Sequence, residues 1–181
     1  MKTKLSLAEK AEIFATAAHA AVKQVRKYTG APYIVHPQEV VELLKNHSSG
    51  PIIEEQIASG WLHDVCEDCN ITLELIREVF GDLVAELVSA LTDVSKSEDG
   101  NRKIRKNIDL DHTAHANPLA KSVKLADLIS NSKSIVEHDK DFARVYLHEK
   151  ERLLEVLGDG DPGLLAEAHR VLKQLREKLR V

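Results

Sequence analysis

Cysteine and aromatic residues are scarce in this chain, and long apolar runs are absent. The 181 residues include only Cys66 and Cys69 as cysteines, too few for the disulfide framework of a small secreted domain. No apolar run approaches the ~20 residues that a membrane-spanning helix needs, and the first residues lack the apolar core of a signal peptide. We therefore expect a soluble protein of the cytoplasm with no membrane partner.

An excess of positive charge is also missing. The formal net charge is −4 at pH 7, whereas domains that bind nucleic acids usually carry a basic excess. The charge balance argues against a nucleic-acid partner. The sequence leaves the oligomeric state open, a homo-oligomer included.

Alanine, leucine, glutamate and lysine dominate the chain, and apolar residues recur at helical spacing. These residue types favour helices, and the glycines and prolines gather between the periodic segments. The pattern predicts an all-α fold in a single domain over residues 1–181, without internal repeats. The first helix should begin after Ser6, which forms a capping box with Glu9. We expect helices over residues 7–25, 37–45, 53–66, 73–80, 82–91, 118–135, 142–157 and 164–179.

The stretch WLHDVCEDC places one imidazole beside three carboxylates on an otherwise apolar segment. These side chains belong to His63, Asp64, Glu67 and Asp68. On one continuous helix they would share one face. Burying them is costly unless a cation holds them, and a divalent metal takes nitrogen and oxygen ligands together. The alternative is a solvated acidic helix end, but the apolar flanks favour a metal site.

Further metal ligands are expected elsewhere in the chain. His36 precedes Pro37, which biases it to an extended backbone, so its side chain can project into a pocket. Asp127 lies in the mostly apolar segment VKLADLISN, where an acid is otherwise unexpected. Lys124 and Asn131 share its helix face. The predicted ligand set is His36, His63, Asp64 and Asp127.

Sequence blocks around these residues resemble the HD-domain metal-dependent phosphohydrolases. Within that family the chain is most similar to the hydrolase domain of RelA/SpoT proteins and to the single-domain small alarmone hydrolases. The resemblance spans roughly residues 8–134, and the synthetase and regulatory domains of long members have no counterpart. Cys69 stands where the family usually has threonine, and Leu128 where it often has a basic residue. The blocks are RKYTGAPYIVHP, WLHDVCEDCNIT, FGDLVAELVSALTD and VKLADLISN.

The resemblance implies an HD-domain helical bundle with a metal site between its helices. It also implies Mn²⁺-dependent hydrolysis of the 3′-pyrophosphate of guanosine alarmones, (p)ppGpp, to GDP or GTP plus pyrophosphate. Nitrogen and oxygen ligands also suit iron, cobalt or zinc. Alternative functions are hydrolysis of (p)ppApp or NADPH, or non-catalytic nucleotide sensing. The intact acid Glu67 argues against a pure sensor.

Catalytic and substrate-binding roles are expected for further residues. Glu67 stands one turn beyond His63, where it can orient or deprotonate the attacking water, with Asp68 beside it. The alternative is that both acids are ordinary solvent-exposed side chains without a catalytic role. The resemblance implies that the basic pair after the first helix contacts the nucleotide and its phosphates. The predicted substrate-binding residues are Arg26, Lys27, Tyr33, Lys124 and Asn131.

Two of these assignments keep an alternative. Tyr33 either lines the pocket or packs against its neighbours. The basic segment from Lys96 to Lys106 can close over phosphates, but a solvated face is the commoner explanation for such a run, and we expect at most one or two of its cations at the site.

Overall fold

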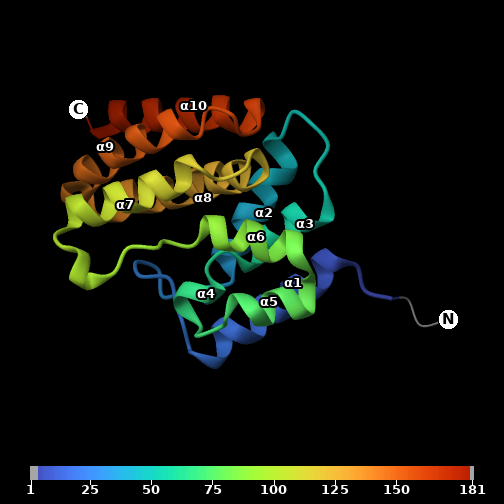
Figure 1. Ribbon diagram of the computed structural model, residues 1–181. Coiled ribbons are helices and arrows are strands. Elements are labelled where there is room, and N and C mark those ends of the chain that lie inside the picture. The colour runs from blue at the N-terminus through green and yellow to red at the C-terminus, as the bar shows by residue number, and fades with distance from the viewer. Residues whose placement is uncertain (1–3, 180–181) are drawn as a thin grey trace.

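The computed structural model describes residues 4–179, whose regular elements are helices (Figure 1). Apart from an isolated bridge between Val25 and Pro32, these residues hold no β-structure. The prediction of an all-α fold is confirmed. The helices are α1 (Leu7–Ala21), α2 (Val35–His47), α3 (Glu54–Leu62), α4 (Val65–Asp68), α5 (Leu73–Phe80), α6 (Asp82–Leu91), the 3₁₀ turn η1 (Ser97–Asp99), α7 (Arg102–Ala114), α8 (Pro118–His138), α9 (Lys140–Val156) and α10 (Pro162–Leu179).

Helix starts follow local capping rules. The predicted capping box of α1 is present, with the Ser6 and Glu9 side chains each accepting a backbone N–H from the other residue. The Thr72 side chain caps α5 by accepting the Leu75 N–H, and Asn117 caps α8 with Pro118 at its first turn. Such side chains satisfy N–H groups that lack a partner within the helix.

Helix α8 is the central helix of the fold. It packs against α2, α3, α6, α9 and α10, and Leu125, Leu128 and Ile129 on it are completely buried. In Figure 1 it lies between the α9–α10 pair and the helices around α2 and α6. A second apolar cluster fills the space between α1, α3, α5 and α6. A polar side chain that points inward from α8 is therefore held from several directions.

Gly60 lets α3 approach α2 closely. A Cβ at this position would lie 3.1 Å from both Leu44 Cδ1 and Val41 Cγ2, tighter than ordinary contacts between packed carbon atoms. The close pairing matters because α2 carries His36 near its start and α3 ends just before His63.

The helix expected over residues 53–66 is interrupted, and that prediction is wrong. Helix α3 ends at Leu62 and α4 begins at Val65. The His63 Nδ1 atom lies 2.9 Å from Gly60 O, the carbonyl that a continued helix would pair with the Asp64 N–H. Asp64 then leaves helical geometry, with φ −101° and ψ −5°. The polar side chains of this segment consequently point in different directions.

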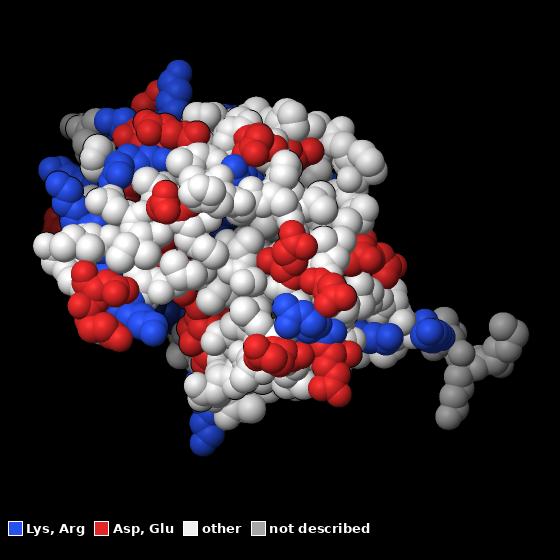
Figure 2. Space-filling model, viewed as in Figure 1, with Lys and Arg blue, Asp and Glu red and all other residues white. Residues whose placement is uncertain are grey.

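The surface mixes both signs of charge. Figure 2 shows acidic and basic side chains interspersed over the face drawn, rather than gathered into one basic stripe. Among the helices of residues 4–179, none combines the length and apolar content needed to cross a bilayer.

Candidate metal centre and active site

The structure brings the predicted metal ligands together at the centre of the fold. The His36 Nε2 atom lies 3.1 Å from Asp127 Oδ1, and His63 Nε2 lies 3.0 Å from Asp64 Oδ2. The two Nε2 atoms are 3.2 Å apart. A divalent ion held tetrahedrally at ~2.1 Å by nitrogen and oxygen ligands places neighbouring ligand atoms about 3.4 Å apart. The ligand atoms of His36, His63 and Asp64 all lie within 4.8 Å of one another, close enough for one shared ion. Asp127 lies beside this group, with its Oδ1 atom 3.9 Å from His63 Nε2.

Electrostatics also favour a cation at this cluster. Burial opposes the charged form of His63, but the charge and hydrogen bond of Asp64, with help from Asp127, raise the imidazole pKa to about 9. Burial likewise opposes ionisation of Asp64, yet the nearby imidazoles hold its carboxyl pKa well below the usual range. The carboxylates thus favour positive charge at this buried site. These side chains suit a divalent metal, whose coordination neutralises that charge.

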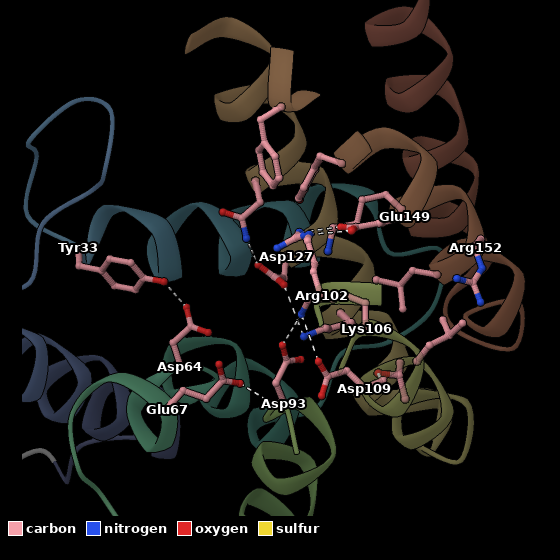
Figure 3. A pocket seen from close by; sticks show the side chains of 18 residues that line it. Tyr33, Asp64, Glu67, Asp93, Arg102, Lys106, Asp109, Asp127, Glu149 and Arg152 are labelled. Carbon is pink, nitrogen blue, oxygen red and sulfur yellow. Dashed lines mark hydrogen bonds and ion pairs between the residues drawn. The ribbon is translucent and has the colours of Figure 1, made fainter. Parts of the chain in front are cut away.

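A cavity of about 340 Å³ opens beside the cluster, within the size range of small-molecule sites. Figure 3 shows Tyr33, Asp64 and Glu67 on one side of it, with Arg102 and Glu149 across from them. The cavity therefore gives a ligand direct access to a carboxylate of the metal cluster.

Glu67 lines this cavity on its exposed side. Its Oε1 atom accepts a hydrogen bond from the Asp93 backbone N–H at 2.6 Å. Partial desolvation, together with the charges of Asp93 and Asp64, raises its carboxyl pKa to about 7. A base whose pKa lies near the working pH is the most effective proton acceptor.

Asp68 points elsewhere. Its Oδ2 atom accepts a hydrogen bond from Gln24 Nε2 at 2.8 Å, and it is not among the residues that line the cavity. Both acids lie on α4, after the break, and their side chains diverge because consecutive helical residues point about 100° apart. Asp93 lies beside Glu67 instead; it closes the block FGDLVAELVSALTD, but its position after a helix carried no local signal of a site.

Two predicted substrate residues share the wall made by α8. Asn131 Nδ2 donates to Asp127 Oδ1 at 2.6 Å, and Lys124 Nζ donates to Leu91 O at 3.1 Å. Burial disfavours the Lys124 ammonium, but Asp127 and other carboxylates raise its pKa. Both residues line the cavity, so α8 supplies an amide group and a protonated ammonium group next to the metal cluster.

The loop between α1 and α2 carries the remaining predicted substrate residues. The Arg26 guanidinium lies 3.4 Å from Asn131 Oδ1 and 5.8 Å from the centre of the Tyr33 ring. Lys27 lies over the Tyr28 ring at 4.9 Å and lines no part of the cavity. Neither basic residue lines the cavity, but Arg26 contacts two residues that do, Tyr33 and Asn131, whereas Lys27 lies further out.

The opposite wall of the cavity holds charged residues, of which the sequence analysis considered only those in the basic segment. Arg102 and Lys106, from the basic segment, line the cavity, whereas the other cations of that segment do not. Arg102 makes a paired contact to Glu149 at 2.8 and 2.7 Å. Lys150 lies 4.9 Å from the Tyr146 ring centre, and burial lowers its pKa to about 8. Nothing in the local pattern of α9 distinguishes these residues from a solvated helix face.

Comparison with known families identifies the class of protein. The family model for the HD domain matches residues 11–148, and the chain belongs to this family. The resemblance inferred from the sequence blocks is confirmed at that level.

Individual relatives narrow the comparison. A zebrafish (Danio rerio) protein named guanosine-3′,5′-bis(diphosphate) 3′-pyrophosphohydrolase MESH1 is 36% identical over 107 residues, which cover 59% of this chain and 57% of that protein. A Synechocystis protein named as a probable enzyme of the same activity is 44% identical over 73 residues, or 40% of this chain and 9% of its own. The chain thus matches little more than half of the first relative's length, and far less of the second's.

A solved structure described as a metazoan ortholog of SpoT that hydrolyzes ppGpp shares the fold. Its TM-score is 0.83, with 22% identity and coverage of 96% of this chain and 98% of that one. A protein from Listeria monocytogenes aligns with a TM-score of 0.63 and 25% identity, covering 81% of this chain and 99% of its own. The likeness extends over nearly the whole helical bundle, and the predicted HD-domain architecture is confirmed.

Proposed function

We propose that this chain hydrolyses the 3′-pyrophosphate of guanosine alarmones, releasing pyrophosphate from (p)ppGpp and leaving GDP or GTP. The observation that carries the proposal is the opening of the His36, His63, Asp64 and Asp127 cluster into a cavity that also contains Glu67. The names of the zebrafish and Synechocystis relatives support the same substrate. A free nucleotide as substrate is also consistent with action in the cytoplasm.

We assign the ligand roles to His36, His63, Asp64 and Asp127, and manganese as the ion. A divalent ion at this position lowers the pKa of a water and neutralises charge that develops on a phosphoryl oxygen. The mixed imidazole and carboxylate ligands suit Mn²⁺, and they suit other divalent transition metals as well. Metal identity is therefore part of the proposal to be tested.

The protein side chains divide the remaining work. Glu67 takes a proton from the attacking water, whose oxygen forms a bond to the phosphorus attached to the ribose O3′ atom. The P–O3′ bond breaks, pyrophosphate carries the new oxygen, and O3′ leaves with a proton. Lys124 supplies positive charge to the phosphates, because its ammonium stays protonated beside Asp127. Arg26 is placed to stack on the purine, which a planar guanidinium does better than an ammonium.

The direct test measures pyrophosphate release from ppGpp by the purified protein with Mn²⁺. Controls are the same reaction with EDTA and an Asp127→Asn variant, which removes one ligand charge while keeping the side-chain shape. Parallel reactions with ppApp and NADPH test the alternative nucleotides. Binding of ppGpp without release at saturating metal would contradict hydrolysis and favour the sensor. Faster turnover of ppApp or NADPH would replace the guanosine substrate.

A further inference from the structure

A chain of hydrogen bonds leads from His36 away from the metal cluster. The His36 Nδ1 atom lies 2.9 Å from Ser130 Oγ, and Ser130 Oγ donates to Glu39 Oε2 at 2.8 Å. His36 and Glu39 lie one turn apart on α2, whereas Ser130 lies on α8. His36 and Ser130 are each 1% exposed, so water does not compete with the bond between them, whereas Glu39 is only half-buried.

The direction of these bonds follows from their donors. An ionised carboxylate only accepts hydrogen bonds, and a serine hydroxyl has a single proton to give. Because Ser130 gives that proton to Glu39, its oxygen must accept one from His36 Nδ1–H. The neutral imidazole then carries its lone pair on Nε2, the atom that lies 3.1 Å from Asp127 Oδ1 and faces the cluster.

His63 also has an acceptor at Nδ1, which leaves its Nε2 atom facing the cluster, but its acceptor is a backbone carbonyl. Its Nδ1 atom lies 2.9 Å from the Gly60 carbonyl, an acceptor that no side-chain substitution removes. The orientation of His36 depends on two side chains that the sequence analysis did not single out. Ser130 lies within the block VKLADLISN, but a serine on a buried helix usually bonds its own backbone.

We propose that Ser130 and Glu39 are positioning residues that hold His36 in its Nδ1–H form, with Nε2 ready to bind the metal. This inference rests on the metal role of His36 in the proposed function. Partners of this kind orient metal-binding imidazoles, and their loss typically weakens metal affinity by about 10- to 100-fold. Neither residue touches the cavity, so substrate binding should be unaffected at saturating metal.

The test compares Ser130→Ala with Ser132→Ala in the full-length protein. Ser132 lies on the same helix and is completely buried, but its hydroxyl has no hydrogen-bond partner among the described residues. The dissociation constant for Mn²⁺ is measured by titration calorimetry, and the His36 tautomer by ¹⁵N NMR of the metal-free imidazole. Melting temperatures in EDTA check that each variant is folded.

Ser130→Ala should weaken Mn²⁺ binding by about 10- to 100-fold and give a mixture of His36 tautomers. Ser130→Thr, which keeps the hydroxyl, and Ser132→Ala should retain wild-type affinity and the Nδ1–H form. Glu39→Gln keeps an acceptor oxygen and should have a smaller effect than Ser130→Ala.

The outcomes separate this inference from the proposed function. Wild-type affinity in Ser130→Ala would overturn the positioning role while His36→Ala still loses the metal. If His36→Ala also binds Mn²⁺ normally, the metal site itself is wrong. Equal losses in Ser130→Ala and Ser132→Ala would reduce the effect to general packing of α8 and would likewise overturn the inference.

Discussion

The Tyr33 hydroxyl donates a hydrogen bond of 2.5 Å to Asp64 Oδ2, the oxygen that lies 3.0 Å from His63 Nε2. Burial and the charge of Asp64 raise the Tyr33 pKa well above its usual range, so the hydroxyl remains a donor. The loop between α1 and α2 is thereby tied to a proposed metal ligand. The sequence analysis assigned Tyr33 to the substrate, whereas this contact gives it a second role.

Replacing Tyr33 with Phe should weaken metal binding by about 10-fold, because a carboxylate ligand loses the hydrogen bond that orients it. The measurement is the Mn²⁺ dissociation constant of the metal-free protein. Tyr28→Phe is the matched control, since the Tyr28 hydroxyl donates to Asp139 at 3.1 Å, outside the cavity. An unchanged metal affinity with a raised KM would return Tyr33 to the substrate role alone.

Asp64→Ala should abolish metal binding and activity together while the fold persists. Removal of Asp64 leaves His63 without a carboxylate partner and the Tyr33 hydroxyl without its acceptor, so the metal-free variant should melt at a lower temperature than the metal-free wild type but remain folded. Metal content is measured by atomic emission. Free ion at ~100 times its Kd should stabilise the wild type by about 2.7 kcal/mol, and EDTA should lower the melting temperature of the wild type only. A full equivalent of metal in the variant would remove Asp64 from the ligand set.

Features determined by near neighbours in the chain could be predicted from the sequence. The capping residues Ser6, Thr72 and Asn117 each act within three residues of their partners. The break between α3 and α4 was not predicted, although the contact that accompanies it, from His63 Nδ1 to Gly60 O, spans only three residues. The apolar spacing over residues 53–66 continues through the break, so helical periodicity alone does not reveal it.

Glu67→Gln should lower kcat by about 10²- to 10⁴-fold, the usual contribution of a positioned general base, with metal content and KM nearly unchanged. The amide keeps an oxygen to accept the Asp93 N–H but cannot take a proton. The wild-type Glu67 carboxyl has a pKa raised to about 7. It is protonated below that pH, so kcat/KM should rise with pH through about 7.

The Glu67→Gln variant should lack this rising limb of the pH profile. Asp68→Asn provides the neighbouring-acid control, since Asp68 faces Gln24 rather than the cavity. Loss of metal in Glu67→Gln would make Glu67 a ligand, and an equal fall in kcat for Asp68→Asn would contradict the separation of the two acids.

Arg26→Ala should raise KM about 10- to 100-fold, because a charge-assisted hydrogen bond to phosphate contributes roughly 1.5–3 kcal/mol. If charge alone matters, Arg26→Lys should have a KM between those of the wild type and Arg26→Ala. If the guanidinium stacks on the purine, its KM should be close to that of Arg26→Ala. Lys27→Ala should also raise KM, by a smaller factor, because Lys27 lies over Tyr28 at the outer side of the loop. The measurement is KM at low and high ionic strength, and the differences should shrink as salt screens the charges. Wild-type values for both residues would place the nucleotide elsewhere.

The sequence singled out site residues where chemistry was unusual for its surroundings, and the structure places these residues close together. An acid in an apolar helix marked Asp127, and a histidine before a proline marked His36. The charges contributed by α9 gave no such signal, because Lys150 and Glu149 look like an ordinary solvated face until α9 packs beside α7 and α8. A cavity wall assembled from distant helices is a property of packing rather than of local pattern.

The burial of α8 on both sides of Asp127 has a consequence for the kinetics of metal exchange. Its amide protons near Asp127 should exchange with solvent only when the whole protein unfolds, since Leu125, Leu128 and Ile129 are fully enclosed. An ion therefore cannot escape by local opening of this helix. Both Asp64 and Asp127 line the cavity, and the side chain of Asp64 is the more exposed, at 19% compared with 10%, so we expect an ion to enter and leave past Asp64 and Tyr33. Metal off-rates should accordingly respond to changes in the α1–α2 loop while hydrogen exchange in α8 stays constant.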